Sequence, residues 1–464
     1  MSEHMIYEPI FLDASSDVPL YRQLYNSIKE RIGGGCPAVG EKMPSIRRIS
    51  EELGISRTPV EQAYGQLCVE GYLVSRPQSG YYVEASVIDK SILPPDNTPE
   101  SEPEPDVRYD FGSRYVDSRS SDLDLWRKYV RAALSREDVV TSYGHFQGEP
   151  ELRRQLTRFG SLIRGVNATP DRIVVGAGVQ PLLSLICGLL GKRAGSVGIE
   201  YPCFPHAERV FRDFRLNITA LGHDKYGITP EELSNTGIDV LYLNPSNTEG
   251  MGRPMPISRR AELLEWAEQA DGLIIEDDYN GALRFRSHPV PAMQGMSDGN
   301  RVIYLGSFSK LLMPSVRISY MVLPPELADL YRSRGSSYNQ TSSKTEQLAL
   351  AEYIRDGHIE KRLRRLRKIY SEKSEQLMSL INEYFGAIAR IRIAETALCA
   401  EMTFDSGRSA KELAEMALNG GVRVIPADTD TGSAKLRLSF AGINSEDMPD
   451  AVRLLHEIIS PYCR

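Results

Sequence analysis

Lys310 lies in the stretch of this chain that is best suited to covalent chemistry. The apolar run Val302–Leu305 predicts a buried strand, and the turn Gly306–Ser309 would present Lys310 at the end of that strand. A desolvated lysine beside another cation has a lowered pKa and can form a Schiff base with a carbonyl compound, and Arg317 follows nearby. A phosphate could be held by three polar residues of the same stretch, Ser307, Ser309 and Arg317. The pattern therefore indicates pyridoxal phosphate, which needs an amine, a phosphate site and an acid.

A second predicted strand supplies the acid. The apolar run Gly272–Ile275 ends in acidic residues and Tyr279, as is typical of a parallel strand that opens onto a ligand crevice. Either Asp277 or Asp278 could pair with the ring nitrogen of the cofactor. The alternative is a pair of solvated loop carboxylates, and the lysine stretch favours the cofactor site.

The elements that must position these residues alternate between strand and helix. Apolar runs predict strands over 172–175, 197–200, 240–243, 272–279 and 302–305, with helices over 123–134 and 149–163. This alternation predicts a mainly parallel sheet with helices on both faces. Further strands over 422–425 and 436–440 predict a small C-terminal subdomain. The basic segment 357–370 predicts a helix whose arginines and lysines lie mainly on a solvated face.

A glycine turn follows the first of these strands. Gly176–Gly178 opens a predicted helix, whose free backbone N–H groups can bind an anion. The turn lacks the third glycine of a dinucleotide fingerprint, and the chain has no Walker A sequence.

Three helices and a hairpin are predicted in the first part of the chain. The helices cover 19–31, 45–53 and 56–70, and the strands cover 72–74 and 81–83. Ser45 is the expected cap of the second helix, and Ser56 or Thr58 that of the third. Helix, short glycine turn and helix predict a helix-turn-helix whose third helix lies in the major groove.

Charge gives this first part no general attraction to DNA. The whole chain has a net charge of -7, and residues 1–83 hold 8 Lys and Arg against 10 Asp and Glu. Any nucleic-acid contact must therefore be local. Four arginines fall at helix starts or in the hairpin, namely Arg47, Arg48, Arg57 and Arg76.

Composition excludes several other classes. The 6 cysteines show no CxxC pair or zinc-finger spacing, so we expect neither a disulfide framework nor a structural metal. No secretory signal or membrane span is evident, and we expect a cytoplasmic protein. The proline-rich acidic segment 84–108 predicts a semi-extended linker.

Several motifs in order resemble known families. GSFSK with Arg317, IEDDY, NPSN and YGHFQG resemble the fold-type I aminotransferases, and PSIRR, LGISRTPVEQAY and EGYL resemble the GntR-type winged helix. The whole chain resembles the MocR/GabR regulators, in which these modules are fused. The resemblance implies a winged helix-turn-helix DNA-binding domain over 1–83, a linker over 84–108, and an aminotransferase-like α/β domain for cofactor, effector and dimerisation over 109–464.

The resemblance also implies residue roles. Lys310 would form the Schiff base, Asp277 would pair with the ring nitrogen, and Phe204 would stack on the ring. Asn247 and Tyr279 would bond to the 3'-oxygen of the cofactor. The phosphate would be held by Gly178, Val179, Gln180, Ser307, Ser309, Arg317 and, from the neighbouring subunit, Tyr143. Arg437 would bind an effector carboxylate, and His206 stands where GABA-responsive members carry an arginine. The implied DNA contacts are Arg47, Arg57, Thr58 and Gly80.

The function that follows is transcription regulation by a homodimer that binds paired or repeated DNA half-sites. An amine-bearing effector, or the cofactor itself, would be sensed by exchange at Lys310. The alternative is an active aminotransferase that carries a DNA-binding module. A third possibility, an enzyme-like domain that serves only as a dimerisation scaffold, is weakened by the retention of Lys310.

Overall fold

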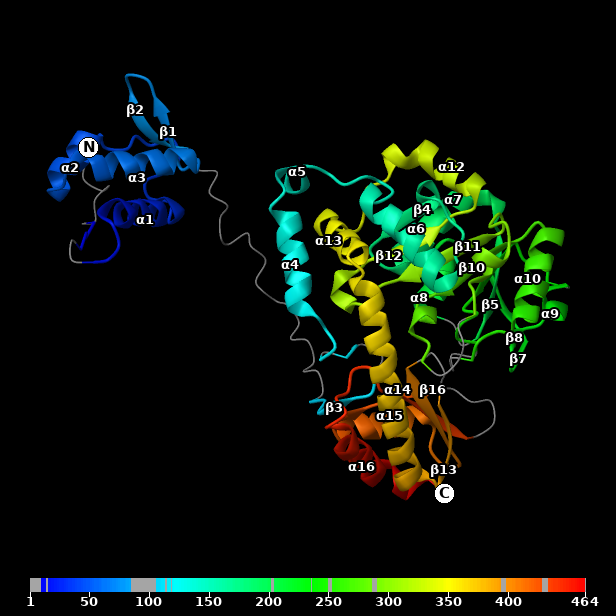
Figure 1. Ribbon diagram of the computed structural model, residues 1–464. Helices are drawn as coiled ribbons and strands as arrows, with labels where there is room; N and C mark the ends of the chain where they lie inside the picture. Colours follow the sequence, from blue (N-terminus) through cyan, green and yellow to red (C-terminus); the bar gives the residue numbers. More distant parts are fainter. Residues whose placement is uncertain are drawn as a thin grey trace. The chain divides into compact units, whose positions relative to one another are not determined.

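The chain forms two compact units, Met1–Glu104 and Pro105–Arg464, each of which is described by itself (Figure 1). The computed structural model describes residues 10–13, 16–84, 106–112, 115–117, 119–201, 204–234, 236–248, 253–285, 290–393, 398–427 and 433–463. Most of the predicted linker, 84–108, lies outside the described residues.

The first unit contains the predicted helices and hairpin, which are α1 (Leu20–Gly33), α2 (Ile46–Leu53), α3 (Arg57–Val69), β1 (Leu73–Arg76) and β2 (Gly80–Val83). The predicted cap of α2 is confirmed, because the Ser45 side chain accepts a hydrogen bond from the backbone N–H of Arg48. Gly54 ends α2 in the left-handed conformation. The helices and the hairpin enclose a core that includes Leu24, Ile28, Val60, Tyr64 and Leu67. The result is a winged helix-turn-helix.

A seven-stranded sheet forms the centre of the second unit, in the order β4-β12-β11-β10-β9-β5-β6. Its strands are β4 (Ile173–Gly176), β5 (Ser196–Glu200), β6 (Asn217–Leu221), β9 (Val240–Leu243), β10 (Leu273–Asp278), β11 (Val302–Ser307) and β12 (Ser319–Val322). β12 alone is antiparallel to its neighbours, which confirms the expected mainly parallel sheet. The carboxyl ends of β4, β9, β10 and β11 therefore meet at one edge.

Helices cover both faces of this sheet, as predicted (Figure 1). On β10, Ile275 packs into a cluster with α7 (Val179–Leu190), α8 (Pro205–Asp213) and α12 (Pro325–Arg334). Ile274 points to the other face, into a cluster with α10 (Ile257–Gln269). The helices α6 (Pro150–Arg164) and α13 (Lys344–Arg355) also contribute to the largest core.

The small C-terminal subdomain is an antiparallel sheet in the order β13-β14-β17-β16. Its strands are β13 (Ala389–Ile393), β14 (Cys399–Phe404), β16 (Ile425–Ala427) and β17 (Ala434–Ser439), with helices α15 (Ala410–Asn419) and α16 (Met448–Ile459). β15 (Val422–Arg423) pairs with β3 (Tyr109–Asp110) at the start of the unit.

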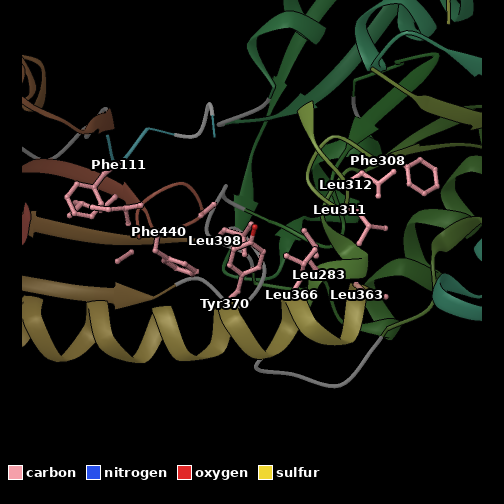
Figure 2. Packing of buried hydrophobic residues seen from close by; sticks show 14 of the residues in the cluster. Phe111, Leu283, Phe308, Leu311, Leu312, Leu363, Leu366, Tyr370, Leu398 and Phe440 are labelled. Carbon is pink, nitrogen blue, oxygen red and sulfur yellow. The ribbon is translucent and has the colours of Figure 1, made fainter. Parts of the chain in front are cut away.

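Helix α14 (His358–Phe385) is longer than the sequence predicted, because its apolar stripe continues beyond Tyr370. Figure 2 shows Leu363 and Leu366 of this helix beside Leu311 and Leu312, which follow Lys310 in the chain. One basic residue departs from the expected solvated face, since Arg362 is only 3% exposed.

No helix in the described part of the chain is long and apolar enough to cross a membrane. The same described residues contain no group of three or more His, Cys, Asp or Glu side chains that could hold a metal ion.

Candidate functional site

Strand register brings the predicted cofactor residues to one edge of the large sheet. Asp277 pairs with Leu305, so β10 and β11 end side by side. Ser307 pairs with Ser319 of β12, which in turn pairs with Gly176 of β4. The loop of Lys310, the acids of β10 and the glycine turn after β4 therefore converge.

The Lys310 amine lies in a partly enclosed position just beyond β11. Burial lowers the pKa of Lys310 to about 8. The sequence predicted a desolvated lysine beside another cation, and desolvation is the cause of this shift. With this pKa, about one amine in ten is neutral at pH 7, whereas an ordinary lysine is almost wholly protonated.

Asp277 is a buried carboxylate with one oxygen left open. The hydroxyl of Tyr242 donates to Asp277 Oδ2 at 2.6 Å. Asp277 Oδ1 is buried and has no hydrogen-bond partner among the described residues. Burial raises the pKa of Asp277 to about 6, although the Tyr242 bond opposes the shift. A buried acceptor without a donor is costly, so this oxygen fits a ligand that carries an N–H group.

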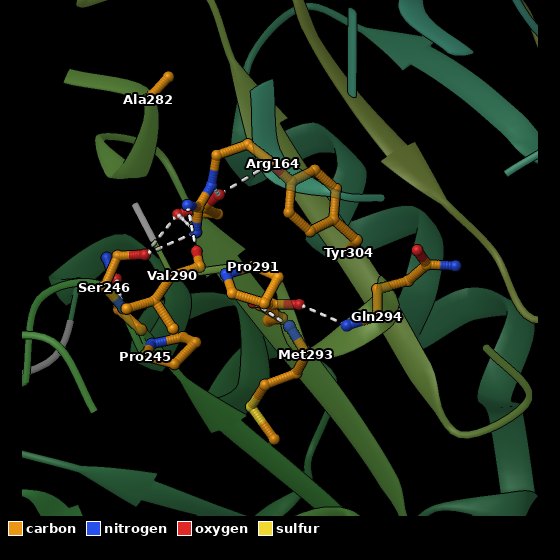
Figure 3. Close-up of polar contacts among 12 residues, drawn as sticks. Arg164, Pro245, Ser246, Ala282, Val290, Pro291, Met293, Gln294 and Tyr304 are labelled. Atoms are coloured by element: carbon orange, nitrogen blue, oxygen red, sulfur yellow. Dashed lines mark hydrogen bonds and ion pairs between the residues drawn. The ribbon is translucent and has the colours of Figure 1, made fainter. Parts of the chain in front are cut away.

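Asp278 is saturated by protein partners, and Figure 3 labels three of them, Arg164, Ser246 and Tyr304. Asp278 Oδ2 lies 2.5 Å from Arg164 Nε and 2.9 Å from the Tyr304 hydroxyl. The Ser246 hydroxyl donates to Oδ1 at 2.8 Å. Burial alone would raise the pKa of Asp278, but the Arg164 guanidinium together with the Ser246 and Tyr304 hydroxyls outweighs it and holds that pKa below its usual value. Asp278, the alternative partner for the ring nitrogen, is therefore part of a structural ion pair.

Asn247 and Tyr279, the two residues implied at the 3'-oxygen, lie together. Asn247 Nδ2 donates to the Tyr279 hydroxyl oxygen at 2.9 Å. Burial, and secondly the Asp277 charge, raise the pKa of Tyr279. Tyr279 thus keeps its proton and can donate a hydrogen bond to a neighbouring oxyanion.

The glycine turn, one arginine and three serines lie where they could hold an anion. Gly178 precedes the first residue of α7 and has φ 110°, where a Cβ atom would lie 2.5 Å from Arg317 Nη2. Arg317 Nη2 also donates to the Ala177 carbonyl at 3.2 Å. The hydroxyls of Ser309 and Ser319 lie 3.3 and 3.1 Å from that of Ser307. The Arg317 cation, the serine hydroxyls and the backbone N–H groups at the start of α7 are all groups that favour the binding of a phosphate.

Val179 and Gln180 form the first turn of α7, where backbone N–H groups lack partners within the helix. Ser319 was missed by the sequence analysis, since no strand was expected at β12.

Arg437 of β17 faces Glu401 of β14, its partner in the strand register. Arg437 Nε donates to Glu401 Oε2 at 2.9 Å, and Glu401 is only 5% exposed. The Arg437 charge slightly opposes the rise in the pKa of Tyr279, so the arginine acts on the site electrostatically. Glu401 was not predicted, because only the three-dimensional pairing of the two strands relates it to Arg437.

Three further predicted residues lie at the surface. Phe204 precedes α8 beyond the end of β5, and its ring lies 5.0 Å from that of His206. Both side chains are exposed. Tyr143, between α5 (Glu137–Val140) and α6, is fully exposed.

The predicted DNA contacts are also accessible. Arg47 on α2 and both Arg57 and Thr58 at the start of α3 are exposed, and Gly80 begins β2 with φ 107°. Arg47 Nε lies 2.8 Å from Glu51 Oε1, and both side chains are exposed. Because an exposed ion pair contributes little free energy, Arg47 can leave Glu51 to bind a DNA phosphate.

Comparison with known proteins agrees with this two-part structure. Residues 20–83 match the family of bacterial regulatory proteins called the gntR family, and residues 115–455 match aminotransferase class I and II. The regulator YdeL of Bacillus subtilis is 36% identical over 96% of this chain and 98% of its own length. The probable rhizopine catabolism regulatory protein MocR of Rhizobium meliloti is 28% identical over 96% of this chain and 95% of its own.

Among solved structures, an archaeal alanine:glyoxylate aminotransferase has a TM-score of 0.69 and 21% sequence identity. The match covers 76% of this chain and 91% of that protein. At this level of identity the likeness concerns the fold.

The lowered pKa of Lys310 predicts unusual reactivity of its amine. Only the neutral amine is a nucleophile, so acylation of Lys310 should rise about tenfold per pH unit below its pKa and level off above about pH 8. Exposed lysines, with pKa values of about 10.4, should continue to react faster at higher pH. Peptide mass spectrometry after brief labelling measures the acylation rates of Lys310 and of the exposed lysines in one sample. Lys310→Ala is the control, and a Lys310 rate that keeps rising with the exposed lysines would contradict the prediction.

Proposed function

This chain belongs to the GntR-type transcription regulators that carry an aminotransferase class I and II domain, and we propose that it regulates transcription in response to an amino compound sensed through pyridoxal phosphate. The observation that carries the proposal is the open Oδ1 of Asp277, because it is a buried acceptor in need of a donor. The protonated nitrogen of a pyridine ring is such a donor, and its positive charge would also favour the ionised carboxylate.

The other residues of the site fit the same cofactor. Bound pyridoxal phosphate supplies an aldehyde that condenses with primary amines and a ring that withdraws electrons. Lys310 provides an amine of which about one in ten is neutral at pH 7. Tyr279 and Asn247 would bond to the ring oxygen, and Tyr242 would hold the Asp277 carboxylate in place.

The anion site would take the phosphate through the start of α7, Arg317 and the hydroxyls of Ser307 and Ser309. Phe204 would cover one face of the ring. Tyr143 would complete the phosphate site of a second subunit, for which its full exposure leaves it available. The active form is accordingly a homodimer with shared cofactor sites.

Arg437 would bind the carboxylate of an amino-acid effector. A guanidinium binds a carboxylate through two parallel hydrogen bonds, and the Glu401 contact at Nε fixes the plane of that group. His206, at the exposed start of α8, lies in the same chain segment as Phe204 and would contact the remainder of the effector.

DNA would be bound through α2, α3 and the hairpin, with Arg47, Arg57, Thr58 and Gly80 as contacts. A dimer presents two such units to paired or repeated half-sites. Such a regulator works in the cytoplasm, where bacterial DNA lies. The effector can change DNA binding only if it binds two arrangements of the protein unequally.

The direct test is fluorescence anisotropy of a DNA fragment selected by the full chain from a random pool. With pyridoxal phosphate present, carboxylated amino acids are titrated against amines that lack a carboxylate. We expect one carboxylated compound to change the DNA affinity, and Arg437→Ala to weaken that response by about 10- to 100-fold while cofactor absorbance is kept. Arg57→Ala should reduce DNA affinity under all conditions. An unchanged response in Arg437→Ala would remove this arginine from the effector site.

A second prediction concerns the anion site. Gly178→Ala adds a Cβ atom that would lie 2.5 Å from Arg317 Nη2, in a backbone conformation that alanine resists. The affinity for pyridoxal phosphate, followed by absorbance titration, should fall by about tenfold or more, since the phosphate loses a charged partner worth about 1.5 kcal/mol or more. Gly188→Ala in the same helix is the matched control, because nothing lies within 4 Å of its added Cβ atom. Equal affinities of the two variants would contradict the assignment.

A further inference from the structure

Arg362, in the first half of α14, holds two distant segments of the chain together. Its Nε donates to the Leu311 carbonyl at 2.6 Å, and its Nη2 donates to the Leu312 carbonyl at 2.7 Å. Its Nη1 donates to the Ser120 carbonyl at 2.6 Å. Leu311 and Leu312 directly follow Lys310, whereas Ser120 lies just before α4 (Leu123–Leu134).

Burial of the Arg362 cation costs free energy of desolvation, which its hydrogen bonds must offset. Arg362 is 3% exposed, and burial lowers its pKa because the cation has lost water. Its neighbours Leu363 and Leu366 pack with Leu311 and Leu312 (Figure 2), so the helix and this loop already share an apolar contact. An apolar residue in place of Arg362 would leave the carbonyls of Leu311, Leu312 and Ser120 without this donor. The planar guanidinium, however, can serve three carbonyls at once, which a lysine cannot do with the same geometry.

The segment that contains Ser120 is fastened to α14 at a second point. Lys373 Nζ lies 2.7 Å from Asp117 Oδ2, and both side chains are buried. The Asp117 carboxylate also accepts from the backbone N–H of Ser120 at 2.6 Å. Lys373 in turn donates to the Ile443 carbonyl at 2.5 Å. Asp117 and Ser120 are therefore both bound to α14, and Arg362 is the residue of α14 that also contacts the loop of Lys310.

We propose that Arg362 is a positioning residue that couples the Lys310 loop to Ser120 and, through Ser120, to Asp117, two residues that precede α4 on the side of the sequence that leads to the DNA-binding unit. The proposal rests on the proposed function, because it needs a ligand that acts at Lys310. A movement of the Leu311 and Leu312 carbonyls alters two of the three hydrogen bonds of Arg362. The altered position of the guanidinium then alters its third hydrogen bond, to the Ser120 carbonyl. A single guanidinium thus links occupancy of the site to the position of the Ser120 carbonyl, just before α4.

Hydrogen exchange of the full chain, measured by mass spectrometry with and without pyridoxal phosphate, tests this coupling. In the unmodified protein, we expect the cofactor to slow exchange by about tenfold both in peptides with Leu311 and Leu312 and in peptides with Ser120. In Arg362→Lys, protection by the cofactor should persist near Leu311 but be lost near Ser120. Arg364→Lys is the matched control, since Arg364 is exposed on the same helix, and it should behave as the unmodified protein.

Undiminished protection near Ser120 in Arg362→Lys would overturn the proposal. Protection near Leu311 without protection near Ser120 in the unmodified protein would overturn it as well, and this measurement stands even if Arg362→Lys does not fold. Absence of both cofactor absorbance and protection near Leu311 would instead contradict the proposed function. The two failures are therefore distinguishable.

Discussion

Desolvation at the carboxyl edge of the seven-stranded sheet determines what the second unit can do. It lowers the pKa of Lys310 to about 8 and raises that of Asp277 to about 6, so the amine is more easily neutral and the acid more easily protonated than in water. Shifted pKa values of this kind are typical of groups that bind a charged ligand or take part in a reaction. The surrounding structure serves to keep water out and to hold these two groups at neighbouring strand ends.

The buried carboxylates at this edge of the sheet need hydrogen-bond and ion-pair partners to offset their loss of water. Arg164 and the Tyr304 and Ser246 hydroxyls satisfy the carboxylate of Asp278, next to Asp277. Removing any partner from a fully buried ion pair is strongly destabilising, so this network is expected to be rigid. The two adjacent aspartates thus have different roles. Asp278 is held in a structural ion pair, whereas Asp277 keeps one oxygen available for a ligand.

The sequence predicted much of this arrangement because it depends on local signals. Apolar runs followed by Lys310, by Asp277 and by Gly178 mark strand ends, and parallel strands bring their ends together. The residue pattern left Asp277 and Asp278 both open, and only the family resemblance implied Asp277, because the difference lies in partners from α6, β11 and the loop after β9. Arg362 was expected on a solvated face for the same reason, since its three carbonyl partners come from residues far away in the sequence.

The central claim is that an amino compound is sensed at Lys310 without being consumed. The most direct measurement is the visible absorption spectrum of the full chain with pyridoxal phosphate during titration with a panel of amino acids, with Lys310→Ala as control. The account predicts a shifted band that persists, with no release of keto acid and with a change in DNA affinity at the same concentrations. Conversion of the cofactor to pyridoxamine phosphate with stoichiometric release of keto acid would contradict it, because the protein would then act as an aminotransferase.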